Sequence, residues 1–295
     1  MRLGVSAGCS RCLLAREMPA MRLSLSVRVA ESFEDKTRLA VPFPEVLAAA
    51  RASGYEGVCL RASVVSVHSP EDRVAQVNAL MREAGLAVSM VTGDVNLAAN
   101  NEHAPDALRN ITPYLDLAEA LGSKRVRVMI HHTEELAYAQ RAADEANERG
   151  LLLCHQVHTG TLFERVAECL DLLRRINRRN VGITYEPANL LAVGEDYGPE
   201  QIKRLGEAIF NVYLQNFRID SGGTIFVKTR GGPVRVMPIP LADKSGVDLD
   251  RVFAGLREVG YDGWVTVHSA SLPGKSVQDW VREYYRVLAT YTRSG

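Results

Sequence analysis

Short apolar and β-branched runs alternate along the chain with longer segments in which apolar residues recur every three or four positions. The short runs are typical of buried strands, and the longer segments are typical of helices that cover a sheet. The predicted strands span residues 23–29, 57–61, 88–91, 125–130, 151–158, 181–186, 209–217 and 264–268. The predicted helices span residues 44–52, 70–84, 105–121, 134–149, 199–205 and 248–259. Two more helices are predicted from apolar stripes. One stripe consists of Phe163, Val166, Leu170 and Leu173, and the other of Trp280, Val281, Tyr284, Leu288 and Tyr291.

Eight strand–helix units in a chain of 295 residues match the size of a (β/α)8 TIM barrel. We therefore predict an α/β fold in a single domain, with the eight strands closed into a parallel barrel. A doubly wound parallel sheet is the alternative. It is disfavoured because the Gly-x-Gly-x-x-Gly phosphate turn that such sheets often carry is missing after the first predicted strand.

The connection over residues 219–247, after the seventh predicted strand, is too long for a simple turn. It contains two β-rich runs, 224–229 and 234–237, bounded by the glycine pairs Gly222-Gly223 and Gly231-Gly232. This pattern predicts a hairpin-like insertion. On a barrel the hairpin either covers the mouth as a lid or decorates the surface, and the pattern favours neither.

The 35 basic and 35 acidic residues give a formal net charge of zero, so charge provides no case for a nucleic acid or a membrane as a partner. The five cysteines are too few and too scattered for a secreted disulfide framework. Cys9 and Cys12 have the spacing of a redox or zinc motif, but no second pair nearby completes a zinc site. We therefore expect a protein of the reducing cytoplasm.

Residues 1–20 show no apolar run long enough for a signal peptide or a membrane span. We expect them to form a disordered extension before a barrel that spans residues 21–295. Met21, at the start of the patterned region, offers an alternative start of translation.

Polar residues lie at the carboxyl ends of several of the predicted strands, at positions where a barrel would otherwise bury apolar side chains. Because TIM barrels keep their chemistry at the carboxyl ends of the strands, these residues predict a shared polar pocket. They are Arg61, Arg127, Gln156, His158, Glu186 with Asn189 just after it, Tyr213, Gln215 with Asn216 beside it, and His268.

Five short sequence motifs occur in order along this chain. They are Gly54-Tyr55-Glu56-Gly57-Val58, Gln156-Val157-His158, Tyr185-Glu186-Pro187-Ala188-Asn189, Val212-Tyr213-Leu214-Gln215-Asn216, and Gly260-Tyr261-Asp262-Gly263-Trp264 leading to His268. With these motifs the chain from Leu23 to its end resembles the xylose-isomerase-like superfamily of sugar isomerases and epimerases, whose members are TIM barrels.

The resemblance implies a divalent metal at the mouth, held by Glu, Asp, His and Glu from the last four strands. Those positions correspond here to Gln156, Glu186, Tyr213 and His268, so all four have changed. A set of Gln156, Glu186 and His268 could still hold manganese, zinc, cobalt or magnesium, though with one carboxylate the affinity for hard ions should fall. Without a metal, the same residues would form a hydrogen-bonding and proton-transfer site, and the sequence leaves both options open.

The resemblance also implies a sugar isomerase or epimerase that acts on a keto-sugar or related polyol through an enediolate. We expect Glu186 to be a metal ligand or the base, with His268 and His158 as proton-transfer partners because histidine titrates near pH 6.5. The remaining pocket residues are expected to bind the substrate. Its hydroxyl groups would be bound by Gln156, Asn189, Tyr213, Gln215 and Asn216. Arg61 and Arg127 would bind a carboxylate or phosphate of the substrate, unless these arginines form ion pairs inside the barrel.

Three alternatives remain. One is a lyase or dehydratase for an inosose-like or 3-keto-sugar substrate, which shares the enolisation step. Another is a non-catalytic sugar-binding barrel, consistent with the changed ligand positions. A DNA-repair endonuclease on this scaffold is disfavoured because the histidine and Asp-x-His stretches of a trinuclear zinc cluster are missing. The expected partner is a small carbohydrate, and a homo-oligomer is compatible with the sequence.

Overall fold

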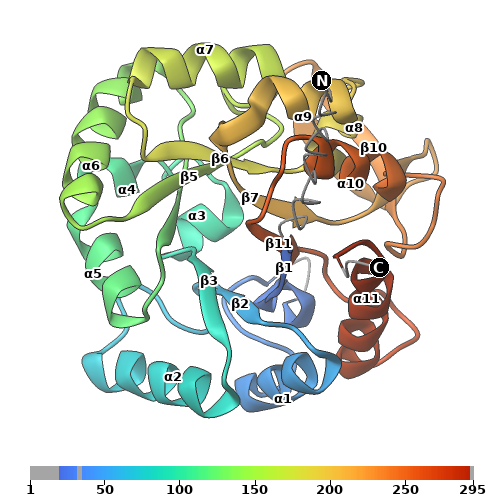
Figure 1. The fold of residues 1–295 in the computed structure, drawn as a ribbon, viewed down its shortest axis with the longest axis horizontal. Coiled ribbons are helices and arrows are strands. Elements are labelled where there is room, and N and C mark those ends of the chain that lie inside the picture. Colours follow the sequence, from blue (N-terminus) through green and yellow to red (C-terminus); the bar gives the residue numbers. More distant parts are fainter. Residues whose placement is uncertain (1–19, 32–34, 293–295) are drawn as a thin grey trace, which may run out of the picture.

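The computed structural model describes residues 20–31 and 35–292. Eight parallel strands close into a barrel in the order β1-β11-β7-β6-β5-β4-β3-β2, with a ring of helices outside it (Figure 1). The barrel strands are β1 (Arg22–Ser26), β2 (Gly57–Leu60), β3 (Ala87–Val91), β4 (Arg125–Val128), β5 (Leu152–Gln156), β6 (Val181–Tyr185), β7 (Ile209–Leu214) and β11 (Trp264–Val267). The prediction of a (β/α)8 barrel is confirmed. The predictions for residues 1–19, including those for Cys9 and Cys12, fall outside the described residues.

The helices that alternate with these strands begin and end close to their predicted positions, with two kinds of difference. They are α1 (Phe43–Ser53), α2 (Glu71–Ala84), α3 (Val95–Ala99), α4 (Asp106–Arg109), α5 (Thr112–Ala120), α6 (Leu136–Glu148), α7 (Val166–Ile176), α8 (Pro187–Ala192), α9 (Pro199–Leu205), α10 (Leu249–Glu258) and α11 (Val277–Thr292), with 3-10 turns at Val27–Ala30, Thr133–Glu135 and Gly206–Ala208. None of the described helices combines the length and the apolar character that crossing a membrane requires.

The single helix predicted over residues 105–121 is wrong, because the chain forms two helices there, α4 and α5. Asn110 leaves the helical conformation at φ −141° and ψ 78°, and Pro113 lies in the first turn of α5, where its missing N–H costs nothing. The short helices α3 and α8 carry no periodic pattern that predicts them. Pro187, interpreted as the end of a strand, also begins α8.

The insertion after β7 forms a three-stranded antiparallel sheet in the order β8-β10-β9. Its strands are β8 (Phe217–Ile219), β9 (Ile225–Thr229) and β10 (Gly232–Pro238). The predicted hairpin is therefore confirmed as β9 and β10, with Gly232 paired to Thr229 at its tip. The strand predicted over residues 209–217 is too long, because β7 ends at Leu214 and Phe217 already belongs to β8.

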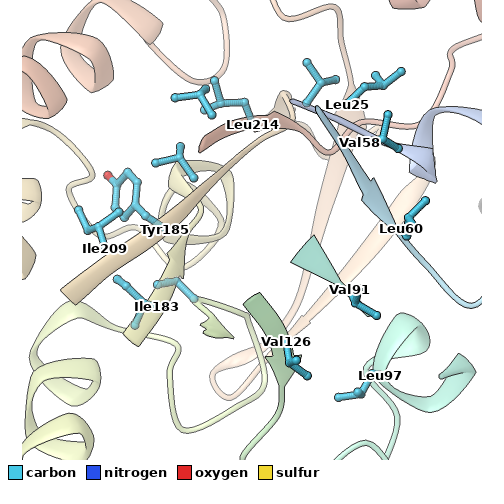
Figure 2. Close-up of a cluster of buried hydrophobic side chains, with 14 of the residues drawn as sticks. Leu25, Val58, Leu60, Val91, Leu97, Val126, Ile183, Tyr185, Ile209 and Leu214 are labelled. Carbon is cyan, nitrogen blue, oxygen red and sulfur yellow. The ribbon is translucent and has the colours of Figure 1, made fainter. Parts of the chain in front are cut away.

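The alternation of side chains along each strand separates two layers of the interior. Outward-facing residues such as Leu25, Val58 and Ile183 form the apolar layer between the strands and the helices (Figure 2). A small group inside the barrel packs separately, and it consists of Cys59, Met90, Cys154 and Tyr213. Since every second residue of a strand points inward, the polar residues that follow these positions are directed toward the barrel mouth.

Candidate active site

A cavity of about 770 Å³ lies at the carboxyl ends of the barrel strands. Most of the predicted pocket residues line it, namely Arg61, Arg127, Gln156, His158, Asn189, Gln215, Asn216 and His268. Glu186 and Tyr213 are fully buried and do not line the cavity directly. The polar ends of strands that are far apart in the sequence therefore meet at one place.

Glu186 lies beneath the cavity floor, directly after β6, on the inward face of its strand. Its carboxylate accepts hydrogen bonds from the side-chain amides of Gln156 and Gln215, one on each oxygen. Burial raises the pKa of Glu186 to about 7, although both amides and Arg127 act in the opposite direction. The result is a carboxyl group that exchanges a proton near neutral pH.

The two amides that cover Glu186 differ in exposure. Gln156 is buried, and its Oε1 has no hydrogen-bond partner among the described residues. Gln215 is half-buried and faces the cavity. Rotation of the Gln215 side chain would open Oε1 of Glu186 to a bound molecule while Gln156 keeps the other oxygen in place.

His268 and Tyr213 form a stacked pair on neighbouring strands. Their ring centroids lie 3.9 Å apart and their planes differ by 6°. Nδ1 of His268 lies 3.1 Å from the Ser26 hydroxyl, and the Tyr213 hydroxyl lies 3.1 Å from Sγ of Cys59. Tyr213 thus supports His268 from below, in the barrel interior, rather than facing a substrate.

His158 and His268, the two predicted site histidines, are neutral at physiological pH. Burial lowers the pKa of His158 to about 3 and the pKa of His268 well below its usual value, and Arg127 adds to both effects. His158 is also held by Asn100 at 2.7 Å and by the Thr159 carbonyl at 2.8 Å. The expected titration near pH 6.5 does not apply here, so these imidazoles are suited to hydrogen bonding rather than to carrying a proton as imidazolium.

The two predicted arginines differ in their partners. Arg61 donates from Nε to both oxygens of Glu31, at 2.9 and 3.0 Å, which is the buried ion pair that the sequence left open. Arg127 instead donates to the side chain of Asn100 and makes no ion pair within the described part of the chain. Asn100 ends α3 at a left-handed φ of 54°, a conformation that asparagine tolerates, and so reaches both Arg127 and His158.

Some of the predicted substrate-binding residues have structural partners. Asn189 donates to the Val157 carbonyl at 2.8 Å. Asn216 donates to the carbonyls of Pro240 and Asp243 and accepts from a backbone N–H of the insertion. Asn216 therefore anchors the segment behind the hairpin. Sequence reasoning missed Lys36, Arg28 and Asn100, which line the cavity. Lys36 lies in a loop and Asn100 at the end of α3, where no periodic pattern marks them, and Arg28 lies in the 3-10 turn Val27–Ala30, where the strand predicted over residues 23–29 has already ended.

The donor set does not fit a divalent metal. Of the predicted ligands, Glu186 is the one carboxylate, and both of its oxygens already accept from the side-chain amides of Gln156 and Gln215. The positive charges of Arg61 and Arg127 already stabilise the charged form of the same carboxylate. Hard cations require several anionic oxygens, and this site supplies one carboxylate. Within residues 20–31 and 35–292, no group of three or more His, Cys, Asp or Glu side chains is placed to hold a metal ion.

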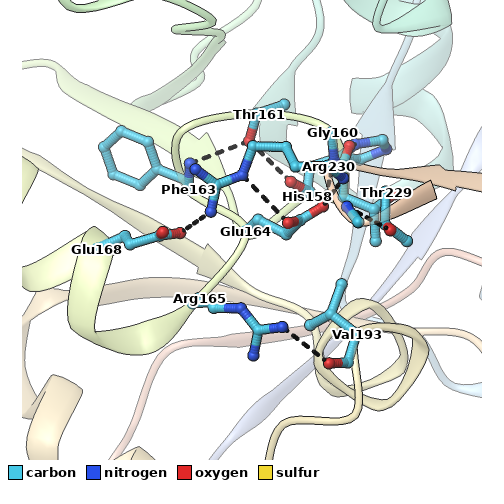
Figure 3. Close-up of polar contacts among 12 residues, drawn as sticks. His158, Gly160, Thr161, Phe163, Glu164, Arg165, Glu168, Val193, Thr229 and Arg230 are labelled. Carbon is cyan, nitrogen blue, oxygen red and sulfur yellow. Dashed lines mark hydrogen bonds and ion pairs between the residues drawn. The ribbon is translucent and has the colours of Figure 1, made fainter.

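The hairpin forms part of the cavity wall, so it covers the mouth rather than decorating the surface. Ile225 to Lys228 of β9 and Val236 of β10 all line the cavity. Arg230, in the turn between these strands, pairs with Glu164 at 3.1 Å and with Glu168 (Figure 3). Glu164 is buried and also accepts from the backbone N–H of Gly160, in the loop that carries His158.

Replacing Arg230 with glutamine is expected to loosen the hairpin. The buried Glu164 carboxylate would lose a charged donor worth about 1.5–3 kcal/mol, enough to speed local opening by about tenfold or more. Hydrogen exchange of the β9 and β10 amides measures this effect. The matched control is Arg165→Gln, because Arg165 pairs with Glu195 at 3.5 Å and has no described hydrogen bond to the hairpin, so its loss should leave the hairpin unchanged. Equal protection of the β9 and β10 amides from hydrogen exchange in the wild-type protein and in both variants would show that the contacts of Arg230 do not hold the hairpin in place.

Comparison with known proteins identifies the family and the fold. The family model described as "Xylose isomerase-like TIM barrel" matches residues 47–288. An inosose dehydratase of Geobacillus thermodenitrificans is 25% identical over 139 residues, which cover 45% of this chain and 45% of that protein. An inosose dehydratase of Lacticaseibacillus casei is 24% identical over 141 residues, or 46% of each chain. The chain thus matches less than half the length of these curated relatives.

Solved structures resemble the whole barrel. A D-allulose 3-epimerase from Methylomonas sp. has a TM-score of 0.67 at 15% identity, covering 92% of this chain and 98% of that one. A xylose isomerase-like TIM barrel protein from Mycobacterium smegmatis, in complex with magnesium, has a TM-score of 0.65 at 13% identity, covering 93% of this chain and 96% of that one. At these identities the likeness shows the fold alone.

Proposed function

Since this chain belongs to the xylose isomerase-like TIM barrel family, we propose that it is an isomerase or epimerase that moves a proton at a carbon next to the carbonyl of a keto-sugar or related polyol. One observation carries the proposal. A single carboxylate, Glu186, lies under the floor of the cavity with its pKa raised to about 7 by burial. A carboxyl group with a pKa near the working pH can both accept and return a proton.

Glu186 is the base in this reaction. The substrate displaces the Gln215 amide from Oε1, and the freed carboxylate takes the proton from the carbon beside the carbonyl. Gln156 holds the other oxygen, so the carboxylate keeps its orientation during the transfer. Hydrogen bonds of this kind often rearrange only when substrate binds, so the closed arrangement is compatible with the role.

The electron pair released from the carbon moves onto the carbonyl oxygen and forms an enediolate. Its negative charge needs preorganised donors. The neutral imidazole of His268 lines the cavity and can supply one. Return of the proton from Glu186 to the former carbonyl carbon, while the hydroxyl proton on the first carbon passes to the enediolate oxygen, gives an isomer. An epimer forms when the first carbon instead takes a proton from solvent on its opposite face.

A dehydratase is the second candidate, supported by the sequence match to two inosose dehydratases. The first step would be the same proton removal by Glu186. The enediolate would then expel a hydroxyl group from the next carbon, and the proton held by Glu186 would leave with it as water, so that no proton returns to carbon. The two reactions therefore share the base and differ in the fate of the intermediate.

Deuterium exchange tests the proposal across a range of substrates at once. We expect the protein, incubated in D2O with a panel of ketoses and keto-polyols, to place deuterium at the carbon beside the carbonyl of at least one member, as followed by NMR. A deuterated isomer indicates an isomerase or epimerase, and an unsaturated product with loss of water indicates a dehydratase. Because no step is assigned to a metal, the exchange should persist after treatment with EDTA. Sugar binding without exchange would contradict the enzyme and favour a binding protein.

A further inference from the structure

The cavity carries much more positive than negative charge. Glu102 is the one acidic residue among the described residues that line it. The basic residues in its lining are Arg28, Lys36, Arg61, Arg127 and Lys228. A neutral sugar would give these cations no counter-charge.

Two buried guanidinium groups have nitrogen atoms without an acceptor in the described part of the chain. They are Nη1 of Arg61 and Nε of Arg127, on side chains that are each 1% exposed. An unsatisfied buried donor of this kind costs free energy, more so when it is charged. Glu31 neutralises Arg61 in part, whereas Arg127 makes no ion pair among the described residues. It donates to the neutral amide of Asn100, and the Glu186 carboxylate acts on it only at longer range. Of these two buried guanidinium groups, Arg127 therefore has the less neutralised positive charge.

Lys36 adds a further cation to the same wall. It is half-buried, and burial lowers the pKa of its ammonium to about 8, with further lowering by Arg28, Arg61 and Arg127. Burial likewise lowers the pKa of Arg127 to about 10. Because Arg127 lowers the pKa of Lys36, the two cations are close in space, and Glu31 raises the pKa of Lys36 by less than each of the three arginines lowers it.

We propose that Arg127 and Lys36 form a binding site for an oxyanion group of the substrate, a phosphate or a carboxylate, so that the substrate is an anionic sugar derivative. This inference rests on the proposed function only in placing the substrate in this cavity. The planar guanidinium orients the oxyanion, and the ammonium adds charge on a flexible stem. Anchoring one end of the sugar in this way fixes the position of its reacting carbons relative to Glu186.

Binding of inorganic phosphate and of acetate, measured by calorimetry at pH 7, tests the site without any turnover. We expect the wild-type protein to bind at least one of them with a Kd of about 1 mM or lower. The Lys36→Gln variant should bind that anion about tenfold more weakly, and Arg127→Gln more weakly still. Lys36 makes no described side-chain hydrogen bond, so its variant tests the site even where Arg127→Gln fails to fold. Phosphate binding points to a sugar phosphate, and acetate binding without phosphate binding points to a sugar acid.

Lys124→Gln is the matched control. Lys124 is exposed and directly precedes β4, at the opposite end of the barrel, so the same change of charge there should leave the Kd unchanged. The inference is overturned when neither anion binds, or when Lys36→Gln and Lys124→Gln have the same effect. That failure is distinct from failure of the proposed function, because deuterium exchange with a neutral ketose would still identify the enzyme.

Discussion

Replacing Glu186 with glutamine is expected to lower kcat by about a thousandfold or more, the loss typical of removing a general base. Glutamine has nearly the same shape and keeps the carbonyl oxygen that accepts from Gln156. It cannot take a proton. The fold should survive, because burial already disfavours the charged form of Glu186, as its raised pKa indicates. Steady-state kinetics and a thermal melt of the variant measure the two effects separately.

The dependence of activity on pH separates a base from a residue that only positions its neighbours. A base acts in its deprotonated form, so kcat/KM should rise with pH through the pKa of Glu186 of about 7 and then level off. The residual activity of Glu186→Gln should lack this rise. The matched control is Gln215→Ala, which removes one hydrogen bond to the carboxylate but retains the base. A Glu186→Gln variant that keeps both near-normal kcat and the rise near pH 7 would contradict the assignment of Glu186.

The same raised pKa has a consequence for stability. The folded protein binds the proton of Glu186 more tightly than the unfolded chain does, so folding is favoured by protonation of this group. Its contribution is fully present below the ordinary pKa of 4.5 and is lost as the pH rises to about 7. The protein therefore accepts a stability cost at neutral pH to keep this carboxylate buried beneath the cavity.

The placement of the main site residues was predictable from strand alternation. Thr184 and Glu186 lie two residues apart around β6, and Thr184 contacts Met90 inside the barrel, so Glu186 shares its inward direction. The same spacing relates Cys154 to Gln156 and Thr266 to His268. Periodicity, together with the location of chemistry in TIM barrels, thus indicated which side chains would converge.

The charge of the cavity was not predictable in the same way. The net charge of the whole chain is zero, which hides a local excess of cations. Lys36 lies in a loop after β1, and Asn100 ends a helix of five residues, so neither belongs to a periodic element. The protonation states of His158 and His268 also depend on tertiary burial and on Arg127, which no local pattern encodes.

Glu31 occupies a position in which a single substitution should damage the fold. Its carboxylate accepts from Arg61 Nε at 2.9 and 3.0 Å and from the Ser63 hydroxyl at 2.7 Å, and Arg28 lies 3.8 Å away. The side chains of Arg61 and Glu31 are 1% and 0% exposed. A buried pair of this kind contributes little net stability, but removing one partner leaves the other charge uncompensated.

Replacing Glu31 with glutamine is therefore expected to lower the free energy of unfolding by about 3–5 kcal/mol, measured by urea denaturation at pH 7. The matched control is Glu56→Gln, because Glu56 pairs with Arg22 at 3.2 Å with both side chains about half exposed. That pair should contribute about 1 kcal/mol at most, since water screens it and the long side chains lose entropy in pairing. If Glu31→Gln cost no more than Glu56→Gln, Arg61 would have to find other compensation. Apart from Glu31, Arg61 donates to the Ala98 carbonyl at 3.1 Å, and its Nη1 has no acceptor among the described residues. Neither contact supplies a second anion, so the larger loss of unfolding free energy is expected for Glu31→Gln.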